Sequence, residues 1–98
     1  MIKSFKNKGL EELFNHGRSS RIDARPAIQK KMRAIMHAIN SSTNTEELRN
    51  AGKGVHPLKG RKGKNFGDWA VWVTGNYRIT FNFDGTDAHI LDYEDYHS

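Results

Sequence analysis

The chain has 98 residues, a formal net charge of +5 at pH 7 and no cysteine. This length allows one domain with a single modest core, and the missing cysteine excludes a small secreted scaffold held by disulfides. No run is apolar enough for a signal peptide or a membrane span, so we expect a cytoplasmic protein with one domain over residues 1–98.

The first half of the chain predicts mainly helices. Ile2–Phe5 is typical of a short strand, and Asn7 is a suitable N-cap for a helix that Gly17 ends. Pro26 suits the first turn of a second helix, which extends to about Asn40.

The second helix has a predicted apolar face. Apolar residues recur at helical spacing: Ile28, Met32, Ile35 and Ile39. The opposite face then carries the polar residues Gln29, Lys30, Arg33 and His37. Further along, Thr43–Glu46 has the spacing of a capping box and predicts a short helical turn through Leu48.

The second half of the chain changes to a period of two, which indicates strands. We predict strands at about 69–74, 77–83 and 86–93, separated by the turn signals Gly75-Asn76 and Asp84-Gly85. The prediction is therefore an α+β fold in which helices pack on one face of a small antiparallel meander.

The first hairpin can take two registers. A two-residue loop at Gly75-Asn76 would set Val71 and Val73 opposite Thr80 and Arg78. A three-residue loop, residues 74–76, would instead align three apolar pairs: Val73 with Tyr77, Val71 with Ile79, and Trp69 with Phe81. Because a one-residue slip moves every side chain to the other face, the apolar pattern favours the three-residue loop.

This register predicts a polar face directed away from the helices. It carries Arg78, Thr80, Asn82, Trp72 and His89. Arg78 in mid-strand would be a rigidly placed phosphate ligand.

Alternative structural roles exist for two of these residues. Arg78 can pair with an acid such as Asp92 or Asp95. Trp72 can stack against RNA or a segment of a protein partner, but we favour packing against the loop at 60–67.

Charge is distributed unevenly along the chain. The stretch 48–67 has no acid, whereas every charged residue after Arg78, histidine aside, is acidic. A basic block of this kind attracts a polyanion, most commonly nucleic acid, and it is equally compatible with a solvated loop or an acidic protein partner. The candidate RNA-binding residues are Lys53, Arg61, Lys62 and Lys64.

The final residues carry unusual chemistry for a chain end: Tyr93-Glu94-Asp95-Tyr96-His97-Ser98. Histidine can take and give a proton near neutral pH, so His97 suits general acid or base catalysis and Asp95 can orient it. RNA can be cut without metal when its 2′-hydroxyl attacks the neighbouring phosphate, and Arg78 and Lys59 suit the charge stabilisation that this reaction needs. Tyr96 or Tyr93 can stack a base.

Metal chemistry has weaker support in the sequence. The histidines at positions 16, 37, 56, 89 and 97 show no ligand spacing, and no thiolate is available. We therefore expect neither a metal nor another cofactor.

Five segments together resemble the HigB toxins of bacterial toxin–antitoxin systems, within the RelE-like superfamily. They are Met1-Ile2-Lys3-Ser4-Phe5, Lys8-Gly9-Leu10, His56-Pro57-Leu58-Lys59-Gly60, Tyr77-Arg78-Ile79-Thr80-Phe81 and Tyr93-Glu94-Asp95-Tyr96-His97. The resemblance implies a single RelE-like domain that cuts messenger RNA on the 70S ribosome. The family's catalytic residues fall on His56, Lys59, Arg78, Asp95, Tyr96 and His97.

The resemblance also implies partners. These are a HigA-like helix-turn-helix antitoxin, the ribosome with its message, and operator DNA reached only through the antitoxin. Two other functions stay open: inhibition of a target such as DNA gyrase, as in ParE-like toxins, and non-catalytic binding of RNA or the ribosome through the basic block alone.

Overall fold

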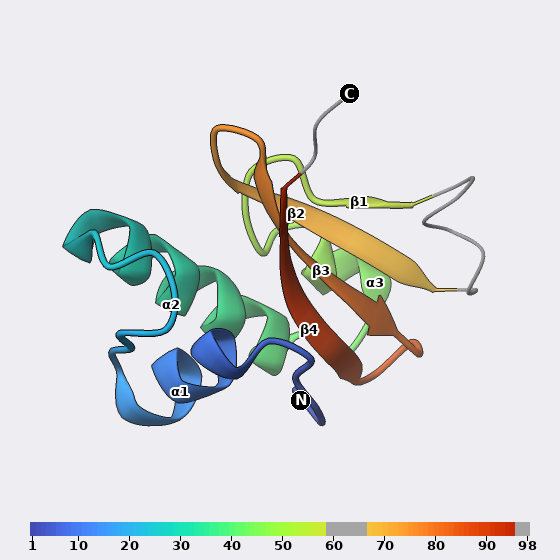
Figure 1. Ribbon diagram of the computed structural model, residues 1–98. Helices are drawn as coiled ribbons and strands as arrows, with labels where there is room; N and C mark the ends of the chain where they lie inside the picture. The colour runs from blue at the N-terminus through green and yellow to red at the C-terminus, as the bar shows by residue number, and fades with distance from the viewer. Residues whose placement is uncertain (59–66, 96–98) are drawn as a thin grey trace.

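Four antiparallel strands form one sheet in the order β1-β2-β3-β4, and α1 and α2 lie together on one side of it (Figure 1). The computed structural model describes residues 1–58 and 67–95. The strands are β1 (His56–Pro57), β2 (Asp68–Thr74), β3 (Tyr77–Phe83) and β4 (Ala88–Asp95), and the helices are α1 (Lys8–His16), α2 (Pro26–Ser41) and α3 (Thr45–Leu48). The predicted α+β class and antiparallel meander are confirmed, with β1 as an added edge strand.

A β-bulge resolves the register of the first hairpin. Val71 pairs with Ile79, as predicted for the three-residue loop. The loop itself has only two residues, because Thr74 pairs with Tyr77 and the irregularity lies between Trp72 and Thr74. The extra residue in β2 thus gives Val71 the partner predicted for the longer loop, whereas Tyr77 pairs with Thr74 in place of the predicted Val73. Val71 and Val73 are both buried in the core.

Helices α1 and α2 begin and end close to their predicted limits. The Asn7 side chain accepts a hydrogen bond from the N–H of Leu10 at 3.0 Å, and Gly17 ends α1 with a φ of +85°. Pro26 occupies the first turn of α2. The short α3 is capped by Asn44 rather than by Thr43, because the Asn44 side chain accepts from the N–H of Glu47 at 2.9 Å.

One residue of α2 lies on the unexpected side. Gln29, predicted on the polar face, is buried. Its amide nitrogen donates to the carbonyl oxygens of Ser19 at 2.6 Å and Asp23 at 3.0 Å. The side chain thus satisfies backbone groups of the α1–α2 connection, a contact that helical periodicity does not reveal.

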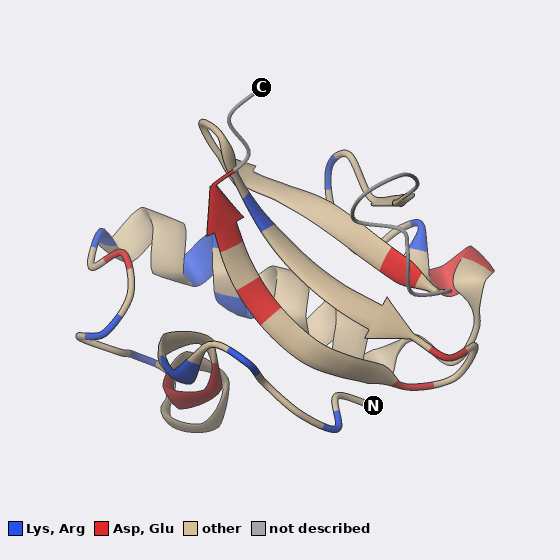
Figure 2. Ribbon diagram, turned by 45° about the vertical axis from the view of Figure 1, so that its right-hand side comes forward, with Lys and Arg blue, Asp and Glu red and all other residues tan. Residues whose placement is uncertain are grey.

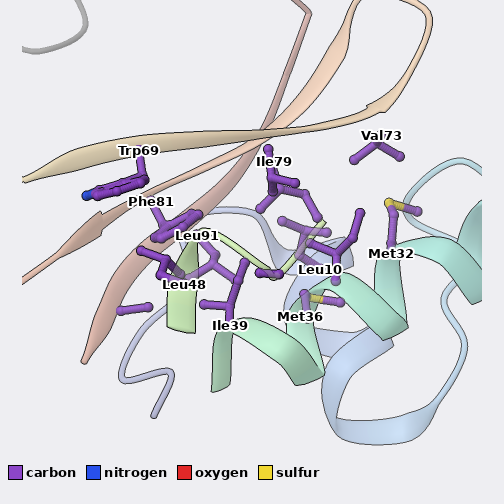
Figure 3. Packing of buried hydrophobic residues seen from close by; sticks show 14 of the residues in the cluster. Leu10, Met32, Met36, Ile39, Leu48, Trp69, Val73, Ile79, Phe81 and Leu91 are labelled. Carbon is purple, nitrogen blue, oxygen red and sulfur yellow. The ribbon is translucent and has the colours of Figure 1, made fainter. Parts of the chain in front are cut away.

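The core lies between the sheet and the helices. In Figure 3, Trp69, Ile79 and Phe81 of the sheet face Ile39 and Met36 of α2. Each of these side chains is buried, so the apolar face predicted for the sheet is the face that the helices cover. Among the described helices, none is long and apolar enough to cross a bilayer.

The segment Ile2–Phe5 pairs with β4 without forming the predicted strand. Ile2 bridges Ala88 and Phe5 bridges Leu91, both in parallel. Between these bridges, Ile90 adopts a φ of +52°, a rare conformation for a β-branched residue. The β3–β4 pairing is irregular here, which identifies a second bulge beside the interrupted N-terminal pairing.

Strand β4 begins two residues later than predicted because residues 84–87 form a closed turn. Its Asp84 carboxylate accepts hydrogen bonds from the N–H groups of Asp87 at 2.8 Å and Thr86 at 3.0 Å, and contacts His89 Nε2 at 2.8 Å. The Asp87 N–H first, and then the His89 ring, hold the pKa of Asp84 well below its ordinary value.

This pKa shift predicts a pH-dependent effect of Asp84→Asn. A carboxyl whose pKa is lowered by folding stabilises the protein above its unfolded pKa, about 4, and loses this contribution as the pH falls through the folded value. The melting temperature of the wild type should exceed that of the variant at neutral pH, and the difference should shrink below about pH 4. Thermal melts from neutral pH to about pH 2 measure it. A difference unchanged by acid would contradict the role assigned to the charge.

Candidate functional site

A shallow depression brings together three separate segments of the chain. It encloses about 330 Å³ and is lined by Lys53, Gly54, His56, Trp72 and Arg78. The sequence predicts RNA-binding or catalytic roles for Lys53, His56 and Arg78, and folding places them around one space. The prediction that Trp72 shares a face with Arg78 also agrees with the structure.

Backbone pairing holds these segments in place. The N–H of Trp72 donates to the carbonyl of Lys53 at 3.1 Å, and His56 begins the strand that pairs with β2. On its other side, Trp72 pairs with Arg78 of β3. Gly54 has a φ of +69°, a left-handed conformation that glycine adopts without strain, whereas a Cβ there would make only an ordinary contact with the Cβ of Trp72 at 3.6 Å.

His56 has a defined proton arrangement. Its Nδ1 lies 2.6 Å from the carbonyl oxygen of Gly54. A carbonyl oxygen only accepts hydrogen bonds, so Nδ1 carries the proton. The ring is exposed, and its Nε2 is therefore accessible to other groups. In the neutral ring, Nε2 can accept a proton or a hydrogen bond.

Arg78 is half-buried, and part of its guanidinium contacts the adjoining turn. Nη1 donates to the carbonyl oxygens of Tyr77 at 3.2 Å and Gly75 at 3.5 Å. Glu94 pairs with Arg78 across the β3–β4 ladder, and its Oε2 accepts from the Thr80 hydroxyl at 2.5 Å. In Figure 2 this basic position of β3 lies beside the acidic end of β4.

Glu94 is a site neighbour that sequence reasoning missed. The acids proposed as alternatives for pairing with Arg78 were Asp92 and Asp95, but the residue opposite Arg78 in the ladder is Glu94. Asp92 pairs with Thr80 and Asp95 with Tyr77. Because side chains alternate along a strand, Asp95, the partner of Tyr77, belongs to the opposite face of the sheet from Arg78 and Glu94.

Several predicted site residues lie outside the described residues. They are Lys59, Arg61, Lys62, Lys64, Tyr96 and His97. The loop at 60–67, proposed as the packing partner of Trp72, lies outside them too, apart from Gly67. Of the six predicted catalytic residues, the structure therefore brings together His56 and Arg78 and sets Asp95 at the neighbouring end of β4.

Tyr93 does not face the depression. Its ring stacks on Tyr77 with centroids 4.9 Å apart, and it packs against the core cluster. Burial raises the pKa of Tyr93 to about 12, and its hydroxyl is enclosed without a hydrogen-bond partner among the described residues. The suggestion that Tyr93 stacks an RNA base is therefore wrong in this structure.

The rest of the polar face is engaged in internal pairs. The amide of Asn82 donates to Asp68 at 3.1 Å, and His89 contacts Asp84 at 2.8 Å. Thr80 is buried beneath Glu94. The polar residues at this end of the sheet thus have structural partners, and the depression at the Trp72–Arg78 end is the candidate site.

A larger depression of about 410 Å³ lies at the end of α1. It is lined by Glu12, His16, Arg18, Ser19, Ser20 and Ala24. Its Ser19 hydroxyl donates to the Glu12 carboxylate at 2.6 Å, and none of its residues was predicted for the site. Among residues 1–58 and 67–95, no group of three or more acidic or histidine side chains is placed to hold a metal ion.

Two comparisons with known proteins match nearly the whole chain. The family model described as "RelE-like toxin of type II toxin-antitoxin system HigB" matches residues 3–97. A curated protein from Proteus vulgaris, named "Endoribonuclease HigB", is 44% identical over 97 residues, which cover 99% of this chain and all of that protein.

Proposed function

We propose, from the premise that this chain belongs to the HigB-like family of RelE-like toxins, that it is an endoribonuclease that cuts messenger RNA on the translating ribosome. The family implies a cognate antitoxin, and we propose that this partner is a HigA-like helix-turn-helix protein through which the pair contacts operator DNA. The relative from Proteus vulgaris, an endoribonuclease by name, supports RNA as the substrate.

The observation that carries this proposal is the meeting of His56, Arg78 and Lys53 around one depression. An imidazole beside a guanidinium and an ammonium group is suited to proton transfer at a phosphodiester. The described part of β4 ends at Asp95, opposite Tyr77, the residue next to Arg78. His97 follows two residues later, and two residues extend at most about 7 Å, so the chain length is compatible with an imidazole near Arg78.

The proposed reaction requires no oxidant or second substrate. A base removes the proton of the ribose 2′-hydroxyl, whose oxygen forms a bond to the adjacent phosphorus. The bond from phosphorus to the 5′-oxygen breaks, and an acid protonates that oxygen. The products are a 2′,3′-cyclic phosphate and a 5′-hydroxyl.

We assign His97 to proton transfer and Arg78 with Lys59 to stabilisation of the phosphorane. His56, Asp95 and Tyr96 position these groups or assist them. Lys59 enters on the sequence pattern and the family resemblance, because it lies outside the described residues.

The test is incubation of the protein with one defined message, with purified ribosomes present or absent as the only variable, followed by mapping of the ends. We expect discrete cuts only when ribosomes are present, each with a 2′,3′-cyclic phosphate on the upstream fragment. A single 2′-deoxynucleotide before the cut should abolish cleavage there and leave other sites unchanged, because it removes the attacking hydroxyl.

Two results would contradict the proposal. Intact transcripts together with damaged DNA in expressing cells would indicate a gyrase-type target. Cleavage at the 2′-deoxy position would exclude attack by the neighbouring hydroxyl.

A further inference from the structure

Two lysines from different elements converge on the Trp72 ring. The ammonium nitrogen of Lys31, from α2, lies 3.7 Å from the ring centroid, and that of Lys53 lies 5.5 Å from it. Both are within the range of cation–π attraction. Trp72 and Lys53 also line the depression that contains His56 and Arg78.

The ring is held in a fixed orientation. Its indole N–H donates to the carbonyl oxygen of Gly75 at 2.9 Å, and its backbone N–H donates to Lys53. An indole that is anchored at its polar edge and half-exposed is a rigid support for the two lysine side chains. Lys31 thereby extends the basic surface beyond the residues that line the depression.

The two ammonium groups repel each other. Burial lowers the pKa of Lys31, and the charge of Lys53 lowers it further. Within residues 1–58 and 67–95, no carboxylate forms an ion pair with either lysine. An anion bound between them would relieve this repulsion, so the arrangement suits a negatively charged ligand.

We propose that Lys31 and Lys53, gathered on Trp72, bind a backbone phosphate of RNA at a subsite next to Arg78 and His56. The inference rests on the proposed function and adds to it a binding subsite with a second basic element, α2. A phosphodiester fits better than an acidic peptide because cations combined with an aromatic ring are the usual means of holding single-stranded nucleic acid. The phosphate belongs to the message or to ribosomal RNA.

The test compares the double variant Lys31→Met/Lys53→Met with Lys30→Met. Lys30 is exposed and adjacent in the same helix, so its replacement removes one charge without touching the Trp72 ring. We expect the double variant to raise the KM for message cleavage about tenfold and to leave kcat within about twofold, because phosphate contacts position the RNA. The slope of the logarithm of the RNA-binding constant against the logarithm of the salt concentration should also become shallower by about one. Lys30→Met should match the wild type.

A second measurement does not depend on cleavage. Binding of a non-cleavable 2′-O-methyl RNA oligonucleotide, followed by tryptophan fluorescence, should weaken about tenfold in the double variant. If the wild type fails to cut RNA but shows this difference, the proposed function fails and the phosphate subsite stands. Ribosome binding of the wild type and the double variant, measured with and without the oligonucleotide, distinguishes the two sources of the phosphate. A defect of the variant that appears only with the oligonucleotide indicates the message, and a defect without it indicates ribosomal RNA.

Three outcomes would overturn the inference. A lower melting temperature with unchanged KM and RNA affinity would show a purely structural role for the lysines on Trp72. Unchanged RNA affinity with weaker antitoxin binding would assign the surface to a protein partner. A fall in kcat alone would place the lysines in the chemical step.

Discussion

Replacement of His97 by alanine is expected to slow single-turnover RNA cleavage by about a hundredfold to ten-thousandfold, the range for loss of a general acid or base. This corresponds to about 3–5 kcal/mol of activation free energy. The expectation follows from the assignment of His97 as the principal proton-transfer group of a metal-independent reaction. Rapid mixing of excess protein with ribosomes programmed by one message measures it, because product release does not then limit the rate.

A matched control is His16→Ala. His16 is exposed in the last turn of α1, remote in sequence from every predicted catalytic residue. This variant should cleave at the wild-type rate, and both variants should melt like the wild type. Cleavage by His97→Ala within about threefold of the wild type, far less than the loss of a general acid or base costs, would remove His97 from the mechanism.

Replacement of Arg78 by alanine should lower kcat by about a hundredfold to a thousandfold, as for the loss of one group that stabilises an oxyanion. Arg78 lies on a central strand with part of its guanidinium hydrogen-bonded to the Gly75–Tyr77 turn, so its position is set before substrate binds. Arg78→Lys keeps the charge but loses the planar fork, and it should fall between the wild type and the alanine variant. Single-turnover rates at saturating ribosome concentrations give the comparison.

The competing explanation is that Arg78 serves the fold by pairing with acids at the end of β4. In that case Arg78→Ala would lower the melting temperature, and the correctly folded fraction would keep its kcat. Glu94→Gln provides the internal comparison, because Glu94 is the ladder partner of Arg78. A rate loss confined to Arg78 variants would support the catalytic assignment, and an equal loss in both would point to the pair as a structural unit.

Local signals in the sequence predicted much of the fold. The helix limits at Asn7, Gly17 and Pro26 depend on capping and on backbone geometry within a few residues, so they could be predicted without the tertiary structure. The period-two pattern and the turn residues likewise predicted the meander.

The two bulges could not be predicted in this way, and they decide what faces the site. If the ladder continued regularly from the Phe83–Ala88 pair, without the irregularity near Ile90, Arg78 would lie opposite Tyr93. The bulge shifts the ladder by one residue, so Glu94 lies opposite Arg78 and Tyr93 turns to the core. One extra residue reverses the faces of all positions after it, because strand side chains alternate with a period of two.

The sequence alone determined the chemical groups available to this protein: the histidines, the basic block and the arginine in a strand. It also determined the helices and strands that carry them, because these depend on interactions between near neighbours. The tertiary structure alone decided that Lys31 of α2 meets Lys53 on the Trp72 ring, and that His56 lies in the same depression as Arg78. Such encounters join residues that are distant along the chain, and they follow from strand register and helix packing, which depend on the whole core at once.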